Sequence, residues 1–544
     1  MSLRFSRALT LAALLLLPLF AGAAPRIFYT DIINGPNTGG LNNLGAFLTI
    51  FGAGFGATQG TSAVTINNTA VGAVIQWSDA KITVQPGPAV TSGAIKVSVG
   101  GVGSNTDQTF TVVPGKIYFV SNGTGTAPIG SDSTGVAGDI TKPFRNIQNV
   151  FDNSLFVPGD HIVVRGGTWS DIYPRIGSFF AIVDKGGTAT APFVIMGYPT
   201  ETATFLRTNQ THGFHSFNTT GHYVISNLVL DANGAGVTIS LEQGSTDIRI
   251  VNNEVKNMLE NGGGAAAIEG SGSQYRILGN HVHDNGGSKL YHALYFDGRA
   301  STAPTDIEIA YNNIHHQSGG RGIQIFSDTL RVITNVRVHN NLVHDISLDG
   351  IHFADNTGAG FQAYNNVVYN TASAALRGPF TDTGTDGGCI RFVSTVLVAL
   401  VYNNTFSNCN LDGDVDSGGI RFQNALSITL INNIVNGKYF VNIGSLPATL
   451  VAPNNLWFGG GTPPTFATVS QTGDPKFVSA ATGNFHLLAG SAAIDNGSAA
   501  VNALVTTDFD GNPRPQGTAP DIGAFESSGV TLPTPANLKV ILLP

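Results

Sequence analysis

Short stretches in which apolar and polar residues alternate recur along the central part of the chain. Residues 306–310, 335–338 and 427–431 are clear examples. Alternation with a period of two over such short runs is typical of β-strands, whereas a helix would repeat every three to four residues. The pattern therefore predicts a chain built mainly from short strands.

An asparagine-containing phrase follows these stretches, as in the Tyr-Asn-Asn-Val-Val of residues 364–368. The copies are spaced by 22 to 38 residues, which is typical of a solenoid whose coils bury their faces by stacking. Asparagine tolerates the left-handed backbone of a corner, and stacked copies can form a hydrogen-bonded ladder. The last asparagines of the copies are Asn227, Asn253, Asn280, Asn313, Asn341, Asn366, Asn404, Asn433 and Asn455.

A third short strand is predicted to close each coil. Three strands per coil with an asparagine corner resemble the right-handed parallel β-helix of pectate-lyase-like proteins. The alternative, an asparagine-rich β-sandwich, does not explain why three strands recur in the same order. The resemblance implies an all-β fold. The closing strands are expected at residues 267–269, 294–296, 322–325, 350–353, 389–392 and 419–422.

The region before the solenoid has a different pattern. Residues 25–114 contain short alternating strands separated by glycine and asparagine turns, which predicts a small immunoglobulin-like β-sandwich. The Phe-Gly-Ala-Gly-Phe-Gly of residues 51–56, Trp77 and residues 110–112 resemble the IPT/TIG family of modules. Such modules usually act as spacers or binders. Residues 1–23 combine a positive start, an apolar run and a small-x-small site, so we predict a secretory signal peptide and a secreted or periplasmic protein.

The β-helix is expected to occupy residues 115–480. Residues 146–153 are predicted to form a short helix that caps the first coil, because an uncovered coil leaves an exposed sheet edge. Residues 481–526 resemble the C-terminal segment of many bacterial secreted β-helix proteins, which favours a structural cap over a catalytic role for its acidic and basic residues. Residues 527–544 are interpreted as a linker or terminal tail.

Composition narrows the range of partners. Charged residues make up 11% of the chain, and glycine accounts for 68 of 544 residues, which suits β-structure with many tight turns. The net charge of −8 argues against nucleic-acid binding. No later stretch resembles a transmembrane segment, and we expect a monomer. Cys389 and Cys409 could form one disulfide, but the sequence leaves their pairing open.

One outward column of the closing strands carries the candidate chemistry. In a β-helix, side chains at one strand position stack about 4.8 Å apart from coil to coil. Aligning the closing strands on their inward Ile or Leu places a large polar residue next in each strand, and long loops enter on the same face. We therefore predict a cleft along these coils. The column reads Glu269, Tyr295, Gln324, His352, Arg391 and Arg421.

The resemblance to pectate-lyase-like enzymes implies cleavage of an acidic polysaccharide by β-elimination. This reaction needs a base for the proton beside a uronate carboxylate, and a cation for the charge that develops. Lys289, His292, Tyr295 and His352 are candidate bases, and Lys289 would act if desolvation lowered its pKa. Arg321 is the candidate catalytic cation. The candidate substrate-binding residues are Glu269, Asp297, Arg299, Gln324, Arg391 and Arg421.

The sequence departs from the motifs of known lyases. It lacks a lyase-specific Lys/Arg motif and the Asp-Pro-His-Asp of β-helix epimerases, and the His-Asp pairs at 283–284 and 344–345 fall on a different strand. A glycoside hydrolase, which needs two carboxylates about 5–10 Å apart, therefore stays open, as does a non-catalytic polysaccharide-binding surface protein. The carboxylates available to a hydrolase are Glu269, Asp297, Asp349 and Asp355.

Residues 412–418 form the best metal candidate. Asp412, Asp414 and Asp416 alternate before a glycine, and hard carboxylate oxygens around a sharp turn suit calcium. The later bidentate Glu of an EF-hand is absent. An acidic β-turn explains the pattern equally well, so calcium is a possible cofactor.

Overall fold

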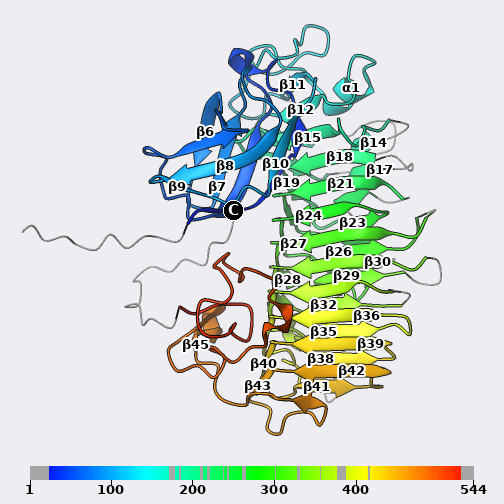
Figure 1. Ribbon diagram of the computed structural model, residues 1–544. Coiled ribbons are helices and arrows are strands. Elements are labelled where there is room, and N and C mark those ends of the chain that lie inside the picture. The colour runs from blue at the N-terminus through cyan, green and yellow to red at the C-terminus, as the bar shows by residue number, and fades with distance from the viewer. Residues whose placement is uncertain are drawn as a thin grey trace, which may run out of the picture.

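The computed structural model shows a long three-sided solenoid with a small domain packed against its side (Figure 1). Almost all regular structure is β-strand, as the alternating pattern predicted. The described residues are 24–170, 178–182, 185–208, 212–216, 221–236, 238–241, 244–259, 265–300, 302–327, 331–355, 357–376, 387–413 and 417–528.

The N-terminal domain is a β-sandwich of two mainly antiparallel sheets. Its core shares Val163, Val194 and Val224 with the solenoid, so the two units pack through a common apolar cluster. The first sheet contains β1 (Arg26–Thr30), β3 (Leu48–Ala53), β7 (Lys81–Gln85) and β6 (Ala73–Trp77). The second contains β2 (Asn34–Gly35), β10 (Thr109–Val112), β8 (Gly93–Val99), β4 (Ala63–Ile66), β5 (Thr69–Ala70) and β9 (Val102–Gly103). A short 3-10 helix spans Leu41–Asn43.

Three parallel sheets of 13, 11 and 10 strands form the sides of the solenoid, and coils away from its ends contribute one strand to each sheet. Sheet 1 contains β11 (Ile117–Val120), β12 (His161–Val164), β15 (Phe193–Gly197), β18 (Gly221–Ser226), β21 (Thr246–Val251), β24 (Tyr275–Leu278), β27 (Thr305–Ala310), β30 (Thr334–His339), β33 (Phe361–Tyr364), β36 (Val398–Tyr402), β39 (Ser427–Ile431), β42 (Thr449–Pro453) and β44 (Ala467–Thr468).

Sheet 2 follows the asparagine corner. It contains β13 (Gly167–Trp169), β16 (Ala203–Leu206), β19 (Val229–Asp231), β22 (Glu254–Lys256), β25 (His281–His283), β28 (Asn313–Gln317), β31 (Leu342–Ile346), β34 (Val367–Tyr369), β37 (Thr405–Ser407), β40 (Ile434–Asn436) and β43 (Leu456–Phe458). Sheet 3 contains the closing strands β14 (Ser178–Ile182), β17 (His212–Ser216), β20 (Ile239–Leu241), β23 (Ala265–Ser271), β26 (Tyr291–Asp297), β29 (Ile323–Phe326), β32 (Ile351–Phe353), β35 (Gly388–Val393), β38 (Gly418–Gln423) and β41 (Val441–Ile443).

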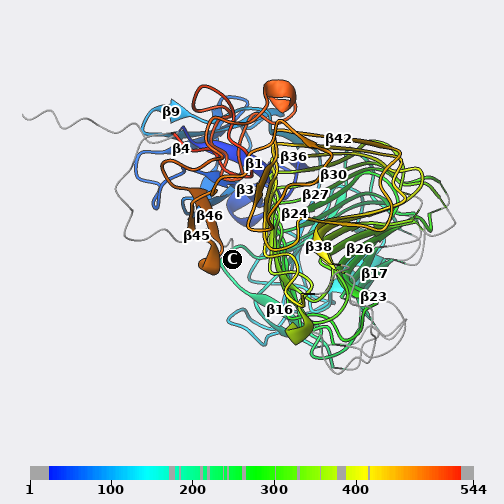
Figure 2. The ribbon, with the colours of Figure 1, turned by 90° about the horizontal axis from the view of Figure 1, so that it is seen from below.

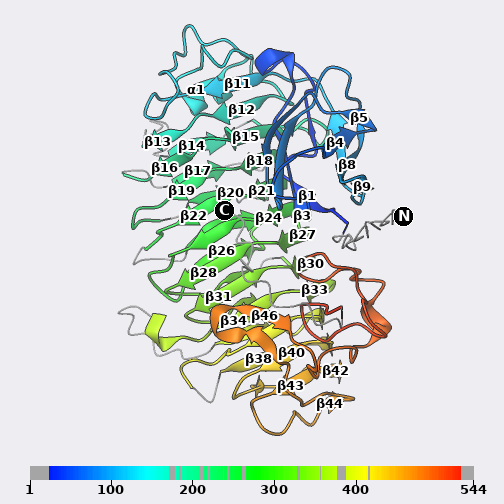
Figure 3. The same cartoon turned by 90° about the vertical axis from the view of Figure 1, so that its left-hand side faces the viewer.

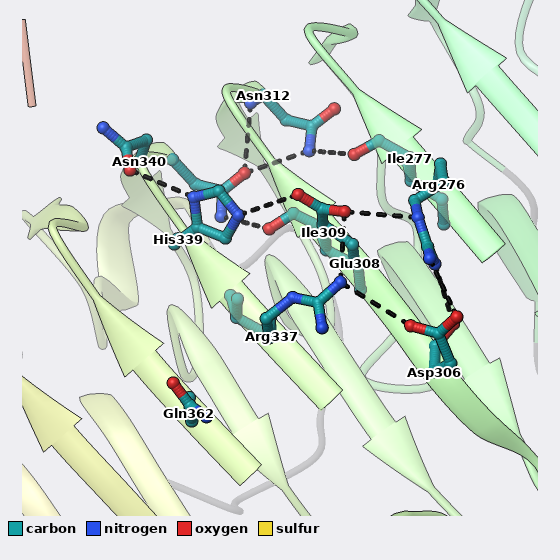
Figure 4. Close-up of polar contacts among 12 residues, drawn as sticks. Arg276, Ile277, Asp306, Glu308, Ile309, Asn312, Arg337, His339, Asn340 and Gln362 are labelled. Carbon is teal, nitrogen blue, oxygen red and sulfur yellow. Dashed lines mark hydrogen bonds and ion pairs between the residues drawn. The ribbon is translucent and has the colours of Figure 1, made fainter. Parts of the chain in front are cut away.

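The asparagine ladder exists, and two of the predicted positions, Asn227 and Asn313, lie one residue away from it. Each buried amide donates to the amide oxygen of the next coil at 2.9–3.1 Å, from Asn253 to Asn455. Each also donates to a carbonyl of the coil before, as Asn312 does to Ile277 at 2.9 Å (Figure 4). In that coil the ladder residue is Asn312 and not Asn313. Asn227 is a left-handed corner residue like Asn252, and the ladder position beside it is Leu228.

A short helix lies at the N-terminal end of the solenoid, where the sequence predicted one. It is α1 (Ile147–Asp152), and the side chain of Asn146 accepts hydrogen bonds from the backbone N–H groups of Gln148 and Asn149. Phe151 is buried and packs edge-on against Phe180. The helix therefore supplies apolar side chains to this end of the core.

The C-terminal segment lies along the side of the solenoid, not over its last coil as a cap would. Figure 2 shows it on the same side as the sandwich, away from sheet 3. Phe485 and Phe525 cluster with Val367 of β34, while Phe466 packs on Trp457 at the final coil. The segment contains β45 (Phe477–Ser479), β46 (Asn484–Leu487) and the 3-10 helices Ala480–Thr482 and Ala499–Val501.

The acidic and basic residues of this segment bind one another and the corner asparagines. Arg514 is buried, forms an ion pair with Glu526 at 2.6 Å and donates to the Gly523 carbonyl at 2.7 Å. Asn403 of the corner donates to the Asp521 carbonyl at 3.2 Å. These contacts give the charged residues a structural role, as the resemblance implied.

The two cysteines form a disulfide between Cys389 of β35 and Cys409, which follows β37. The bond ties sheet 3 to the end of sheet 2 within neighbouring coils. A further 3-10 helix, Ala374–Leu376, lies between β34 and β35. Among the described residues, no helix has the length and apolar character needed to cross a membrane.

Candidate functional site

The predicted polar column is present on sheet 3 with the expected register. Strand pairing places Glu269 beside Tyr295, Tyr295 beside Gln324, and Gln324 beside His352. His352 in turn pairs with Arg391, which pairs with Arg421. The alternate positions are buried apolar residues of the core, such as Ile351 and Phe353. Side chains from six coils therefore form one continuous line, which we call the sheet 3 column.

The column is much less exposed than a solvated sheet face. Glu269, Gln324, His352, Arg391 and Arg421 have exposures of only 6–8%. Ionisable groups at such depth interact strongly with one another, because little water screens them. The column therefore has the burial expected of a binding site.

Asp349 connects several members of this site. It lies in the loop before β32 and is fully buried. Its Oδ2 accepts from Nε of Arg321 at 2.8 Å and lies 3.7 Å from Nη1 of Arg391. Arg321 also donates to Gln324 at 3.0 Å. The carboxylate therefore holds two guanidinium groups, one from the coil before its own and one from the coil after.

His352 lies next to this carboxylate but forms no hydrogen bond with it. Its Nδ1 is 3.8 Å from Oδ2 of Asp349, and neither ring nitrogen has a hydrogen-bond partner among the described residues. Burial, and then the charges of Arg321 and Arg391, hold the pKa of His352 well below its usual value. The imidazole is therefore neutral and has a lone pair available to accept a proton.

His292 has a different state. Its Nδ1 accepts a hydrogen bond from the backbone N–H of Arg321 at 3.2 Å. Burial and the charge of Arg321 lower the pKa of His292 well below its usual value, so the ring is neutral and its hydrogen is on Nε2. The ring lies 5.6 Å from that of Tyr295, centre to centre. In this arrangement Nε2 of His292 is a donor, and a catalytic role for His292 stays a prediction.

Two predicted residues lie at the edge of the site. Lys289 is exposed in the loop before β26, so the desolvation that would activate it as a base is absent. Arg299 is also exposed and pairs with the buried Asp297 at 3.1 Å. Lys289 and Arg299 therefore face solvent at the edge of the site, and their functional roles stay predictions.

The calcium prediction is not tested by the coordinates. Asp412 is half-buried, and its backbone N–H donates to the Ala372 carbonyl at 3.0 Å. Asp414 and Asp416 lie outside the described residues. The hydrolase candidate Asp355 is exposed near the end of β32. Calcium binding at residues 412–416 stays a prediction.

Comparison with protein families identifies both units of the chain. Residues 212–390 match the model of a right-handed β-helix region, and residues 31–112 match that of the IPT/TIG domain. The chain is a right-handed β-helix protein with an N-terminal IPT/TIG domain. We found no curated protein whose sequence matches it.

Several solved β-helix structures resemble this one in part. The crystal structure of pectate lyase Pel9A is 15% identical, with 76% of this chain and 96% of that chain covered and a TM-score of 0.47. The structure of XylC with xylose is 11% identical, with 66% of this chain and 87% of that chain covered and a TM-score of 0.40. The lacto-N-biosidase from Eubacterium ramulus is 12% identical, with 65% of this chain and 67% of that chain covered and a TM-score of 0.40. At these values the similarities carry no information on activity.

The β-helix has a second charged cluster on sheet 1, between the IPT/TIG domain and the C-terminal segment (Figures 3 and 4). Glu308 forms ion pairs with Arg276 and Arg337 at 3.2 and 3.3 Å, and its Oε1 lies 3.1 Å from Nε2 of His339. Arg276 also pairs with Asp306 at 2.8 Å. These residues neutralise one another, so we interpret this cluster as structural.

The column extends further than the sequence analysis proposed. Strand pairing continues it upward from Glu269 to Ser240 and His215, and downward from Arg421 to Asn442. Gln423 was also missed, and it accepts from Nη2 of Arg391 at 2.9 Å. The Phe-His-Ser of residues 214–216 has the same apolar-polar order as the other closing strands, so this signal was present in the sequence.

Proposed function

We propose that the sheet 3 column binds an anionic, uronate-containing polysaccharide and cleaves it by β-elimination. The observation that carries this proposal is His352, a buried neutral imidazole without a hydrogen-bond partner, placed beside guanidinium groups from adjacent coils. A base next to cations is the combination that removal of a proton beside a carboxylate requires. A stacked column of coils also suits an extended chain of sugars.

Each step of the reaction can be assigned to a residue of this site. His352 would take the proton beside the uronate carboxylate, and the electron pair would form the ring double bond as the glycosidic C–O bond breaks. Arg321 and Arg391 would bind the carboxylate, where negative charge increases in the transition state. His292, through its Nε2 hydrogen, or Tyr295 would protonate the leaving oxygen.

The same arginines make His352 responsive to the substrate. Their positive charges help to keep its pKa low in the free protein. A bound carboxylate offsets these charges, so it raises the pKa of His352 and makes it a stronger base when substrate is present. The site would therefore gain basicity on binding an anionic sugar.

A hydrolase fits this arrangement less well. It needs one carboxyl group kept protonated as the general acid. Asp349 and Asp297 each form an ion pair with an arginine, at 2.8 and 3.1 Å, so both carboxyl groups already have a cationic partner. Glu269 accepts a hydrogen bond from the backbone N–H of Ala266 at 2.9 Å, so one of its oxygens is occupied as an acceptor.

We also propose that the protein is exported. The disulfide between Cys389 and Cys409 suits an oxidising compartment. The signal peptide expected at residues 1–23 lies outside the described residues.

Activity on a panel of uronate polymers tests the proposal. β-Elimination gives an unsaturated product that absorbs in the ultraviolet, whereas hydrolysis gives reducing ends without this absorbance. His352→Ala should lower kcat by about 10²- to 10⁴-fold, while His344→Ala on sheet 2 should retain the wild-type rate. Binding without cleavage would contradict the proposed activity. Loss of activity in Lys289→Ala with retention in His352→Ala would contradict the assigned base.

A further inference from the structure

Three histidines gather on the outer face of sheet 2, away from the sheet 3 column. His281 and His283 lie at alternate positions of β25, so both point outward. His315 of β28 pairs with His283 in the parallel register. One ring nitrogen from each residue can be chosen so that all three atoms lie within 4.8 Å of one another. We call these residues the sheet 2 histidines.

Ring stacking alone does not explain this arrangement. His283, His315, His344 and Tyr369 form a stacked column with ring centres 4.8–5.2 Å apart. His281 belongs to the neighbouring column, yet its Nε2 lies 2.8 Å from Nε2 of His315. The cluster therefore converges on a point between two coils, as the ligands of a metal ion do.

We propose that the sheet 2 histidines bind one divalent transition-metal cation of the zinc type, with Glu254 as the fourth ligand. Zinc takes imidazole and carboxylate ligands at about 2.0–2.2 Å in a tetrahedron, which places ligand atoms about 3.3 Å apart. Nε2 of His281 and His315 would need to separate by only about half an ångström to reach this geometry. Glu254 of β22 lies beside the cluster, since its Oε1 is 3.3 Å from Nε2 of His283. The same oxygen pairs with Nζ of Lys256 at 2.5 Å, and a bound cation would have to displace this ammonium group.

Residues around the cluster orient the rings for binding. Nδ1 of His283 lies 2.7 Å from Oδ2 of Asp284, which leaves Nε2 of that ring to face the metal. Nδ1 of His315 lies 2.5 Å from Nδ1 of His316, which leaves Nε2 of His315 free to act in the same way. A carboxylate behind a histidine ligand is the usual device that fixes its tautomer.

A cation held here would tie together three successive coils through β22, β25 and β28. His281, His283 and His315 are only partly buried, so the ion could enter from solvent. Soft thiolates are absent from the cluster, and the ligands are nitrogen with one oxygen, which favours zinc, copper or nickel over calcium. The expected effect is a more stable solenoid.

Zinc titration of tag-free, EDTA-treated protein at neutral pH tests this proposal. The wild type should bind one equivalent by calorimetry and melt at a higher temperature with Zn²⁺, whereas Ca²⁺ should have no effect at this site. His281→Ala and His315→Ala should each lose the bound equivalent. His486→Ala, a histidine of the C-terminal segment, should keep it. Asp284→Asn should weaken binding by about 10- to 100-fold.

Two results would overturn the proposal. One is a wild-type protein that binds no Zn²⁺. The other is an unchanged stoichiometry in His281→Ala and His315→Ala. If either variant fails to fold by circular dichroism, Co²⁺ absorption of the wild type decides the matter. Intense d–d bands of a tetrahedral nitrogen site support the proposal, and the weak spectrum of hydrated Co²⁺ contradicts it.

Discussion

Replacement of Asn341 by alanine tests how much the asparagine ladder contributes to stability. Asn341 is fully buried. Its amide nitrogen donates to the Ile309 carbonyl at 2.9 Å and to Asn366 at 3.0 Å. Its amide oxygen accepts from the backbone and side-chain nitrogens of Asn312, both at 3.0 Å. Alanine removes all four bonds.

The largest free-energy cost of this substitution comes from the buried polar groups that lose their hydrogen-bond partner. The backbone N–H of Asn312 would remain buried without an acceptor, which costs about 1–3 kcal/mol. The other lost bonds and the small cavity add about 1–2 kcal/mol. We therefore expect Asn341→Ala to lower the free energy of unfolding by about 2–5 kcal/mol.

Guanidinium unfolding followed by circular dichroism and tryptophan fluorescence measures this loss. Coincident transitions by the two probes establish the two-state condition on which the free energy depends. Asn496→Ala is the control, since Asn496 is exposed and should change stability by less than about 0.5 kcal/mol. A loss below about 1 kcal/mol for Asn341→Ala would refute the energetic role assigned to the ladder.

Three further predictions concern pH and the disulfide. Because the pKa of His352 is held low, kcat/KM of the free enzyme should persist as pH falls below the ordinary pKa of histidine; a profile that drops at that ordinary value would contradict this. Burial alone would raise the pKa of Glu308, but the hydrogen bond from His339 and nearby arginine charges lower it to about 2. Its stabilising effect is therefore present above the ordinary pKa of Glu and is lost as pH falls toward 2. Glu308→Gln should remove up to about 3 kcal/mol of this acid dependence, and equal acid melts of variant and wild type would reject the prediction. Reduction of the disulfide between Cys389 and Cys409 should cost about 3 kcal/mol by chain entropy, measured as a lower Tm; an unchanged Tm would contradict it.

The repeat made the fold and the column predictable. Because successive coils stack, residues at the same position of aligned repeats become neighbours in space. The pairing of His352 with Arg391 was therefore predictable from the alignment of the closing strands. The corner at Tyr311 has the same length as its neighbours, but its asparagine pair starts one position later, and this shift was not recognised from the sequence. Tyr311 takes the left-handed corner there, and the ladder residue becomes Asn312.

Contacts that depend on loops and side-chain rotamers were less predictable. The salt bridge between Arg321 and Asp349 joins two loops, and no repeat fixes their path. Lys289 lies in another loop whose path the repeat does not fix, so its exposure was not predictable either. The His-Asp pair at 283–284 was visible in the sequence, but only the diagonal approach of His281 to His315 shows that sheet 2 has a possible site of its own.

A crystal structure of His352→Ala with an oligosaccharide of the uronate polymer that the wild type cleaves tests the central claim most directly. We predict that the sugars lie along the sheet 3 column and that one carboxylate contacts Arg321 or Arg391, with the adjacent ring proton facing position 352. A sugar bound to another sheet, or one with its carboxylate away from both arginines, would contradict the account.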